Sequence, residues 1–141
     1  MIPTAAIDTS VLIAAHLESD QNHEACLRLW QRGRLAIYSH GLSEAFSTLT
    51  GGRIEPRVPA SIVAELMTRS VLPKVTTLTL PADALIDAFT QVETRGVRGG
   101  AILDLLHLMA ANHAGLKRIY TLDDRDFKAF HRPGDAEILS P

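Results

Sequence analysis

The stretch TAAIDTSVLIAA (residues 4–15) joins a short apolar run to one acid and two hydroxyls. Its first part, AAI, predicts a buried strand, and SVLIAAHL after it predicts a helix. Asp8 lies at the junction between them and is followed at once by Thr9 and Ser10. A carboxylate in such a run is costly unless another group pairs with it. Asp8 therefore either caps the helix or belongs to a site.

The same alternation of strand and helix continues along the chain. Further strands are predicted at 35–39, 74–80, 118–122 and 136–139. Further helices are predicted at 21–33, 41–52, 59–72, 82–96 and 101–115. Strands separated by helices imply a parallel sheet with helices on both faces, which is a three-layer α/β fold. In such sheets, sites lie outside the carboxyl ends of the strands.

The length and composition indicate one globular domain over residues 1–141. Hydrophobic residues make up 46% of the chain, which argues against disorder. The formal net charge of -2 predicts no strong bulk attraction to nucleic acid or to membranes. Cys26 is the only cysteine, so no disulfide forms within the chain, as is usual in the cytoplasm. We see no signal peptide and no membrane span, and expect a cytoplasmic protein.

Four acids occupy corresponding places in this pattern. Asp8 ends the first strand, and Glu44 follows the second strand and is expected in the first turn of its helix. Asp104 is expected in the first turn of the helix AILDLLHLMAANHAG, and Asp123 directly follows the strand RIYTL. Because the carboxyl ends of parallel strands share one edge of a sheet, these four side chains could converge.

Each acid taken alone is explained more simply as a helix cap or a first-turn acid. The joint pattern is harder to explain in that way, above all for Asp104, which has apolar neighbours on both sides. Clustered carboxylates repel one another, and divalent cations such as Mg²⁺ or Mn²⁺ relieve that repulsion through hard oxygen ligands. Such ions also orient water and stabilise charge on a phosphoryl group.

The motifs IDTSVLIA, SEAF, ILDLLHLMAA and IYTLDDRDF resemble those of PIN-domain ribonucleases in order and setting, and most closely VapC-type toxins of toxin–antitoxin pairs. The resemblance runs nearly end to end. It implies a PIN-like domain with a central parallel sheet flanked by helices. It also implies an Mg²⁺- or Mn²⁺-binding catalytic cluster. The matching positions are Asp8, Glu44, Asp104 and Asp123, with supporting roles for Thr9, Ser10 and Thr121.

Two departures from the family pattern matter. DLLH stands where DALH is usual, and the last motif offers three acids, so that Asp126 competes with Asp123 as the fourth member. The resemblance further implies a structured RNA substrate such as tRNA or rRNA, a VapB-type antitoxin and a homodimer. The reaction would be cleavage of RNA phosphodiesters by an activated water.

Other readings stay open. A phosphatase with an Asp nucleophile needs a second acid where Ser10 stands, and a catalytically inactive PIN-like module would be free to lose its acids. Histidines could cleave RNA without metal, although we expect His107 to be a structural partner rather than a base. Two loops rich in arginine could bind RNA phosphates, or could be merely solvated. Their candidate residues are Arg53, Arg95 and Arg98.

Overall fold

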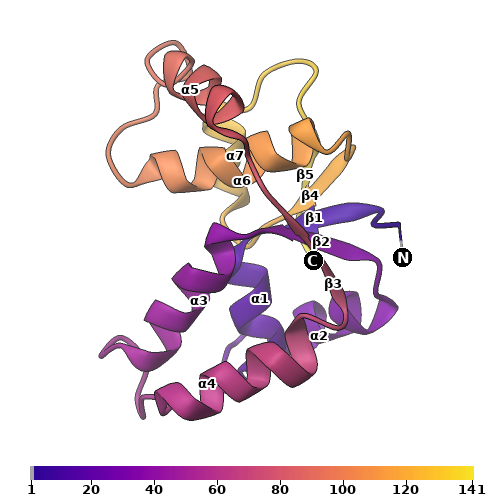
Figure 1. The fold of residues 1–141 in the computed structure, drawn as a ribbon, viewed down its shortest axis with the longest axis vertical. Coiled ribbons are helices and arrows are strands. Elements are labelled where there is room, and N and C mark those ends of the chain that lie inside the picture. Colours follow the sequence, from indigo (N-terminus) through magenta and orange to yellow (C-terminus); the bar gives the residue numbers. More distant parts are fainter. Residues whose placement is uncertain (1) are drawn as a thin grey trace.

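The computed structural model describes residues 2–141, which form a five-stranded parallel sheet between two layers of helices (Figure 1). The strand order across the sheet is β3-β2-β1-β4-β5. This confirms the predicted three-layer α/β fold. The strands are β1 (Ala5–Ile7), β2 (Leu35–Tyr38), β3 (Val75–Leu78), β4 (Arg118–Tyr120) and β5 (Glu137–Leu139).

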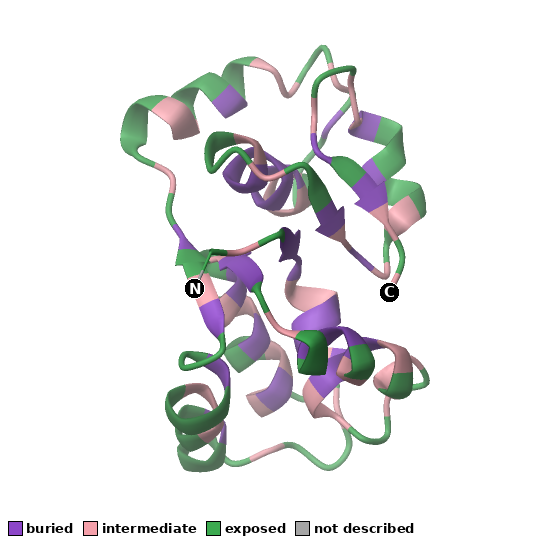
Figure 2. Cartoon of the chain, turned by 90° about the vertical axis from the view of Figure 1, so that its right-hand side faces the viewer, coloured by how far each residue is buried: buried purple, intermediate pink, exposed green. Residues whose placement is uncertain are grey.

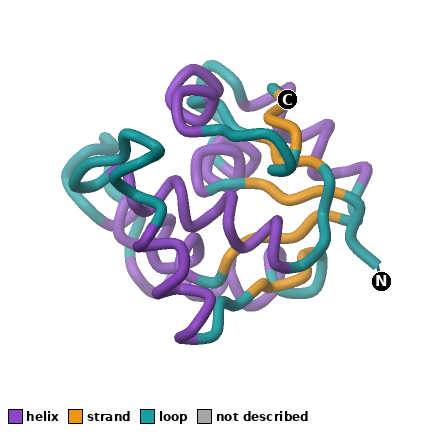
Figure 3. The backbone as a smooth tube through the Cα atoms, turned by 90° about the horizontal axis from the view of Figure 1, so that it is seen from above, coloured by secondary structure: helices purple, strands orange, loops and turns teal. Residues whose placement is uncertain are grey.

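The helices divide between the two faces of the sheet, as seen in Figures 1 and 3. One face carries α1 (Thr9–His16), α2 (His23–Arg32), α3 (His40–Thr50) and α4 (Ala60–Leu66) with its continuation η1 (Met67–Val71). The other face carries α5 (Ala82–Thr90), α6 (Ala101–His113) and α7 (Asp124–Phe130). No helix of the described residues is long and apolar enough to cross a membrane.

A separate hydrophobic core fills each space between sheet and helices, so the buried residues gather in the middle of the molecule (Figure 2). Alternation along the strands assigns side chains to the two cores. Ile7 of β1 packs with Ile37 and Trp30 in the first core, whereas Ala6 joins Phe127 in the second. The central strand is therefore buried on both sides, which is why its sequence is apolar throughout.

The register of the sheet aligns the ends of three strands. Ile7, the last residue of β1, lies beside Ile37 of β2 on one side and Tyr120 of β4 on the other. The segments that follow β1, β2 and β4 therefore begin at the same edge of the sheet. In Figure 1 this edge faces left, as does the N-terminal end of α6.

Two predicted helices end well short of their predicted bounds, and a third begins one residue early. The helix predicted at 59–72 is α-helical only to Leu66 and then widens into the π-helical turn η1, where the Leu72 amide bonds the Met67 carbonyl. The helix predicted at 82–96 ends at Thr90, whose hydroxyl donates to the Asp87 carbonyl and so competes with the helical bonds. In α3, the helix begins early, at His40, because the chain turns directly after β2.

Helix α7 was not predicted from the sequence. Only a few features of the sequence indicate this helix. They are two acids in its first turn, a Lys128–Asp124 pair one turn apart and two phenylalanines, which are buried. Phe127 and Phe130 pack against each other with ring centroids 5.2 Å apart. A helix of one to two turns gives too little periodicity to stand out from a loop, and tertiary packing stabilises it here.

Candidate active site

The candidate active site lies at the aligned carboxyl ends of β1, β2 and β4. Asp8 directly follows β1 and is the N-cap of α1, and Asp123 is the N-cap residue of α7 after β4. Glu44 comes from α3, where it lies in the second turn rather than in the predicted first turn. Asp104 lies in the first turn of α6, as predicted. Four elements distant in sequence therefore contribute one acid each.

Asp8 is almost fully buried and is held by three donors. Its Oδ1 accepts hydrogen bonds from the Ser10 hydroxyl at 2.6 Å and from the Val11 amide at 3.2 Å, the latter being the helix cap. Its Oδ2 accepts from the Thr121 hydroxyl at 2.6 Å. Burial raises the pKa of Asp8 above its ordinary value, although these bonds oppose the shift. Asp8 is thus a cap and a candidate site residue at once.

The two hydroxyls that hold Asp8 also fix the loop that carries Asp123. Ser10 Oγ accepts from the Leu122 amide at 3.1 Å, and Thr121 Oγ1 accepts from the Asp123 amide at 2.9 Å. Each hydroxyl therefore donates to Asp8 and accepts from the β4–α7 loop, which uses both of its hydrogen-bonding functions. Ser10 and Thr121 thus lie in contact with Asp8, and their supporting role in a site stays a prediction.

Glu44 is held by a different hydroxyl and a histidine. Its Oε1 accepts from the Thr9 hydroxyl at 3.0 Å and lies 2.9 Å from His107 Nε2. The Nε2 atom of His107 is also 3.2 Å from the Thr9 oxygen. Although partial burial would raise the pKa of Glu44, its contacts with His107 and Thr9 hold that pKa below the ordinary value.

The pKa of Asp104 is affected by its burial and by the charges of the other acids. Burial raises its pKa to about 6 from an ordinary value of 3.8, with further contributions from the negative charges of Asp8, Asp123 and Glu44. These contributions require that the carboxylates lie near one another, because the interaction falls off with distance. A bound divalent cation would relieve such repulsion between neighbouring carboxylates.

The fourth position involves Asp123 and its neighbours. Partial burial raises the pKa of Asp123, and the charges of Asp8, Asp126 and Asp124 add to the shift. Asp123 and Asp126 are both largely exposed, and Asp126 lines a hollow together with Asp104, whereas Asp124 pairs with Lys128 at 3.3 Å. The Asp123 backbone amide is linked to Asp8 through Thr121, and the charge of its carboxylate contributes to the raised pKa of Asp104. We therefore define the acid cluster as Asp8, Glu44, Asp104 and Asp123, and the choice of Asp123 as its fourth member stays a prediction.

The donor chemistry of the acid cluster fits a hard divalent cation. Asp8 Oδ2 retains one lone pair, and within residues 2–141 no protein group donates to Glu44 Oε2 or to the Asp104 carboxylate. In the same part of the chain, no three acidic, histidine or cysteine side chains lie close enough to ligate one ion together. Mg²⁺ commonly takes one or two carboxylates and completes its shell with water and phosphate oxygens.

A hollow of about 630 Å³ adjoins the cluster beside Asp104. It lies between the loop at residues 93–97, the start of α6 and the exposed side of α7, and its lining includes Asp126, Ala101, Phe130 and Arg132. Arg98 and Arg53 are exposed in their loops, and their guanidinium groups make no ion pair among the residues that the structure describes. Both remain available to contact phosphates.

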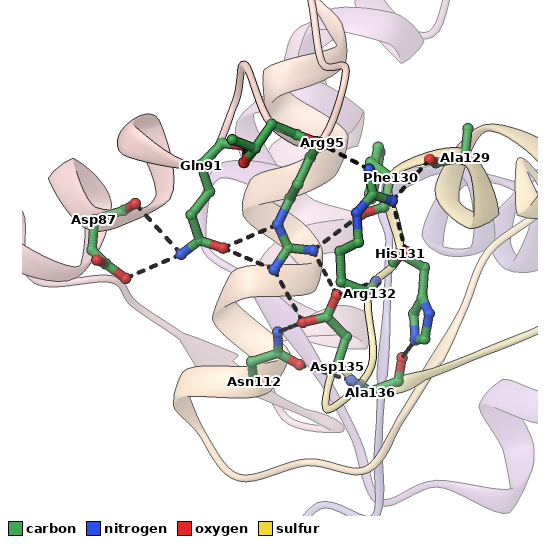
Figure 4. Close-up of polar contacts among 11 residues, drawn as sticks. Asp87, Gln91, Arg95, Asn112, Ala129, Phe130, His131, Arg132, Asp135 and Ala136 are labelled. Carbon is green, nitrogen blue, oxygen red and sulfur yellow. Dashed lines mark hydrogen bonds and ion pairs between the residues drawn. The ribbon is translucent and has the colours of Figure 1, made fainter.

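Arg95 occupies a different environment from the other two arginines, shown in Figure 4. Its guanidinium group pairs with Asp135 at 2.6 Å, and both side chains are about nine-tenths buried. The remaining donors bond the Gln91 side chain and the Phe130 carbonyl. All five N–H donors of an arginine are thereby used. Arg95 ties the loop after α5 to the segment before β5, so its guanidinium group has no donor left for an RNA phosphate.

Comparison with known proteins gives a family. The family model of the PIN domain matches residues 5–133. No curated protein sequence matches the chain. Among solved structures, the chain is similar to the sarcin–ricin-loop-cleaving toxin VapC20 of Mycobacterium tuberculosis, with 21% identity and a TM-score of 0.71. The similarity covers 92% of this chain and 99% of that one.

Two further structures share the fold. One is VapBC2 of Rickettsia felis bound to a promoter DNA fragment, with 17% identity, a TM-score of 0.66 and coverage of 100% and 99% of the two chains. The other is a toxin–antitoxin complex from Klebsiella pneumoniae, with 18% identity, a TM-score of 0.66 and 97% coverage of both chains. Because the family model spans nearly the whole described fold, the chain belongs to the PIN-domain family.

Proposed function

We propose that this PIN domain is a divalent-metal-dependent endoribonuclease that acts as the toxin of a toxin–antitoxin pair. The observation that carries the proposal is the acid cluster itself. Asp8, Glu44, Asp104 and Asp123 arrive from four different elements, and burial together with the charges of the other three acids raises the pKa of Asp104 to about 6. A protein gains no stability from such an arrangement, so a function that uses it is the simpler explanation.

The residues of the cluster would divide the work of holding Mg²⁺ or Mn²⁺. Asp8 and Asp104 would be ligands, and Asp8 would bind through Oδ2 because Oδ1 already accepts two hydrogen bonds. Glu44 and Asp123 would act through their free oxygens or through ordered water. When bound, the cation would lower the pKa of a water for attack on a phosphodiester and stabilise the charge on its oxygens.

The RNA would lie across the edge of the sheet. The hollow beside Asp104 offers room next to the cluster, and the exposed Arg98 lies in the loop directly before α6. Arg53 would contact the backbone further away. These contacts bind phosphates without reading bases, so sequence preference would come from the shape of the RNA.

A cleavage assay with matched variants tests the proposal. The purified protein should cut structured RNA in Mn²⁺ or Mg²⁺ and should stop cutting in EDTA. Asp8→Asn and Asp104→Asn should each abolish cleavage. Asp83→Asn, an equally isosteric change in the exposed first turn of α5, should leave it intact. Circular dichroism of all the variants checks that the fold is retained.

The outcomes separate the proposal from its rivals. Hydrolysis of small phosphoesters in preference to RNA would identify a phosphatase. Cleavage that persists in EDTA would point to the histidines, and binding of RNA without cleavage to an inactive module. Each of these outcomes would overturn the proposed function.

The toxin role carries expectations about partners and place. VapBC2 and the Klebsiella complex support a VapB-type antitoxin for this chain, and we expect a homodimer in the cytoplasm. Expression alone should arrest bacterial growth, and co-expression of the antitoxin from a neighbouring reading frame should restore it. Asp8→Asn should abolish the arrest, whereas growth arrest by that variant would contradict the proposal.

A further inference from the structure

We infer that His107 is a positioning residue for the acid cluster: together with Thr9 it fixes which oxygen of Glu44 faces the cation. The inference rests on the proposed function. It assigns to His107 a role that neither a buried space-filling ring nor a general base would have. The role is carried by hydrogen bonds that join three elements.

The first step is the direction of the hydrogen bonds. An ionised glutamate only accepts, so the Thr9 hydroxyl donates its single hydrogen to Glu44 Oε1 at 3.0 Å. The Thr9 oxygen can then only accept from His107. Both neighbours of His107 Nε2, at 2.9 and 3.2 Å, are therefore acceptors, which assigns a hydrogen to Nε2. This N–H is shared between Glu44 and Thr9.

The second step concerns the two oxygens of Glu44. Oε1 accepts from both Thr9 and His107, which occupies its two lone pairs. Over residues 2–141, Oε2 receives no hydrogen bond from the protein, so it is the oxygen left for a cation or its water. Without the two donors, the carboxylate would be free to rotate and to exchange its oxygens.

The third step is the rigidity of the ring. His107 is 2% exposed and lies one turn after Asp104, on the same face of α6. The Tyr38 ring packs edge-on against it at 5.8 Å. Gly41 of α3 lies so close that a Cβ there would fall 2.8 Å from the imidazole Cε1. One helix thus carries both Asp104 and the group that holds Glu44.

The second ring nitrogen of His107, Nδ1, makes the positioning role testable by substitution. Nδ1 of His107 is buried and has no hydrogen-bond partner among the described residues. All hydrogen bonding from the ring therefore passes through Nε2. The amide nitrogen of glutamine can take the place of Nε2, whereas the shorter side chain of asparagine reaches only the place of Nδ1. The two substitutions are similar in polarity and differ in which atom they replace.

The test compares His107→Gln with His107→Asn. Mn²⁺ affinity is measured by isothermal titration calorimetry without RNA, and kcat and KM are measured on RNA. The Asn variant should bind Mn²⁺ about 10- to 100-fold more weakly, as is usual when a partner of a ligand is lost, and the Gln variant should restore most of the affinity. The loss of activity should appear in kcat rather than in the KM for RNA. His131→Asn, which removes a hydrogen bond to the Ala136 carbonyl, controls for general destabilisation.

A second pair of variants keeps the test valid if His107→Asn does not fold. Thr9 is only half-buried, so Thr9→Val should fold, and it removes the other donor to Oε1. It should weaken Mn²⁺ binding, and Thr9→Ser should restore it. Equal Mn²⁺ affinity of wild type, His107→Asn and Thr9→Val would refute the positioning role alone. A wild-type protein that binds no Mn²⁺ would refute the proposed function and this inference with it.

Discussion

Replacing Asp104 by asparagine should stabilise the protein in EDTA at neutral pH, although it removes an ionisable side chain from a helix N-terminus. Burial and the other acids raise the pKa of Asp104 to about 6 from 3.8. For an acid, a raised pKa in the folded state means a cost that is absent below pH 3.8, grows up to about pH 6 and is complete above it. The wild type should therefore lose stability across this window as the pH rises.

The size of the effect follows from the shift. A difference of about two pKa units corresponds to about 3 kcal/mol, and solvent screening of a half-buried side chain reduces this to about 1–2 kcal/mol. Loss of the first-turn charge costs about 0.3–1 kcal/mol in return. For a chain of 141 residues, each kcal/mol shifts the melting temperature by about 3 °C. The variant should therefore melt at or above the wild-type temperature, by up to about 5 °C, at pH 7.5 in EDTA.

The cation should reverse this order. At a hundredfold excess over its dissociation constant, a cation that binds only the folded wild type adds about 2.7 kcal/mol, and the variant should gain much less. Melts of both proteins in EDTA and in Mn²⁺, at pH 4 and at pH 7.5, measure each contribution. Asp83→Asn, in the exposed first turn of α5, measures the loss of a first-turn charge alone. If Asp104→Asn melts below the wild type by as much as that control, or if Mn²⁺ raises both melting temperatures equally, the assignment of Asp104 is wrong.

Three further predictions concern groups around the site. Thr121→Val should lower the free energy of unfolding in urea by about 1–3 kcal/mol, because a buried carboxylate loses a donor at 2.6 Å; Thr121→Ser should lose less, and equal losses would contradict this reasoning. Asp135→Ala should cost about 3–5 kcal/mol at pH 7 by leaving the buried Arg95 unpaired. Because Arg95 holds the pKa of Asp135 below its ordinary value against the effect of burial, the wild type should lose this stability as the pH falls below about 4; parallel pH curves for the two proteins would refute the pairing. Gly41→Ala should lower the free energy of unfolding by about 1–3 kcal/mol despite the better helix propensity of alanine, because its methyl group would overlap the His107 ring. An unchanged melting temperature would show that the ring moves aside.

The sequence allowed the layers and the positions of the acids to be predicted, because both depend on local patterns. Apolar strands alternate with helices, and acids follow the strand ends. The partners of His107 could not be predicted in this way. Glu44 lies 63 residues from it and Thr9 lies 98 residues away, and only the packing of α6 beside β2 brings them together. An imidazole has no periodic signal that reveals which nitrogen is used.

The two arginines of the loop before α6 also show that contacts with distant residues cannot be predicted from local sequence. Arg95 and Arg98 stand in one glycine-containing loop and look alike in sequence. One is drawn inward by Asp135, 40 residues further on, while the other stays exposed. An acid outside the motif therefore determines which of the two guanidinium groups is buried and which stays exposed. Likewise, α7 could not be predicted, because its two phenylalanines stabilise a helix only through their packing in the second core.

The order of strands also has a consequence for the protein while it is being synthesised. Asp8 emerges from the ribosome early, together with two of its three donors, Ser10 and Val11. The third donor, Thr121, follows β4, the strand that pairs with β1. A nascent chain that ends before β4 has no Asp123 and no Thr121, and it exposes an edge of the central strand. The acid cluster therefore cannot assemble until more than 120 residues have been translated and released from the exit tunnel. Any reaction that depends on the complete acid cluster can therefore begin only after β4 has docked beside β1.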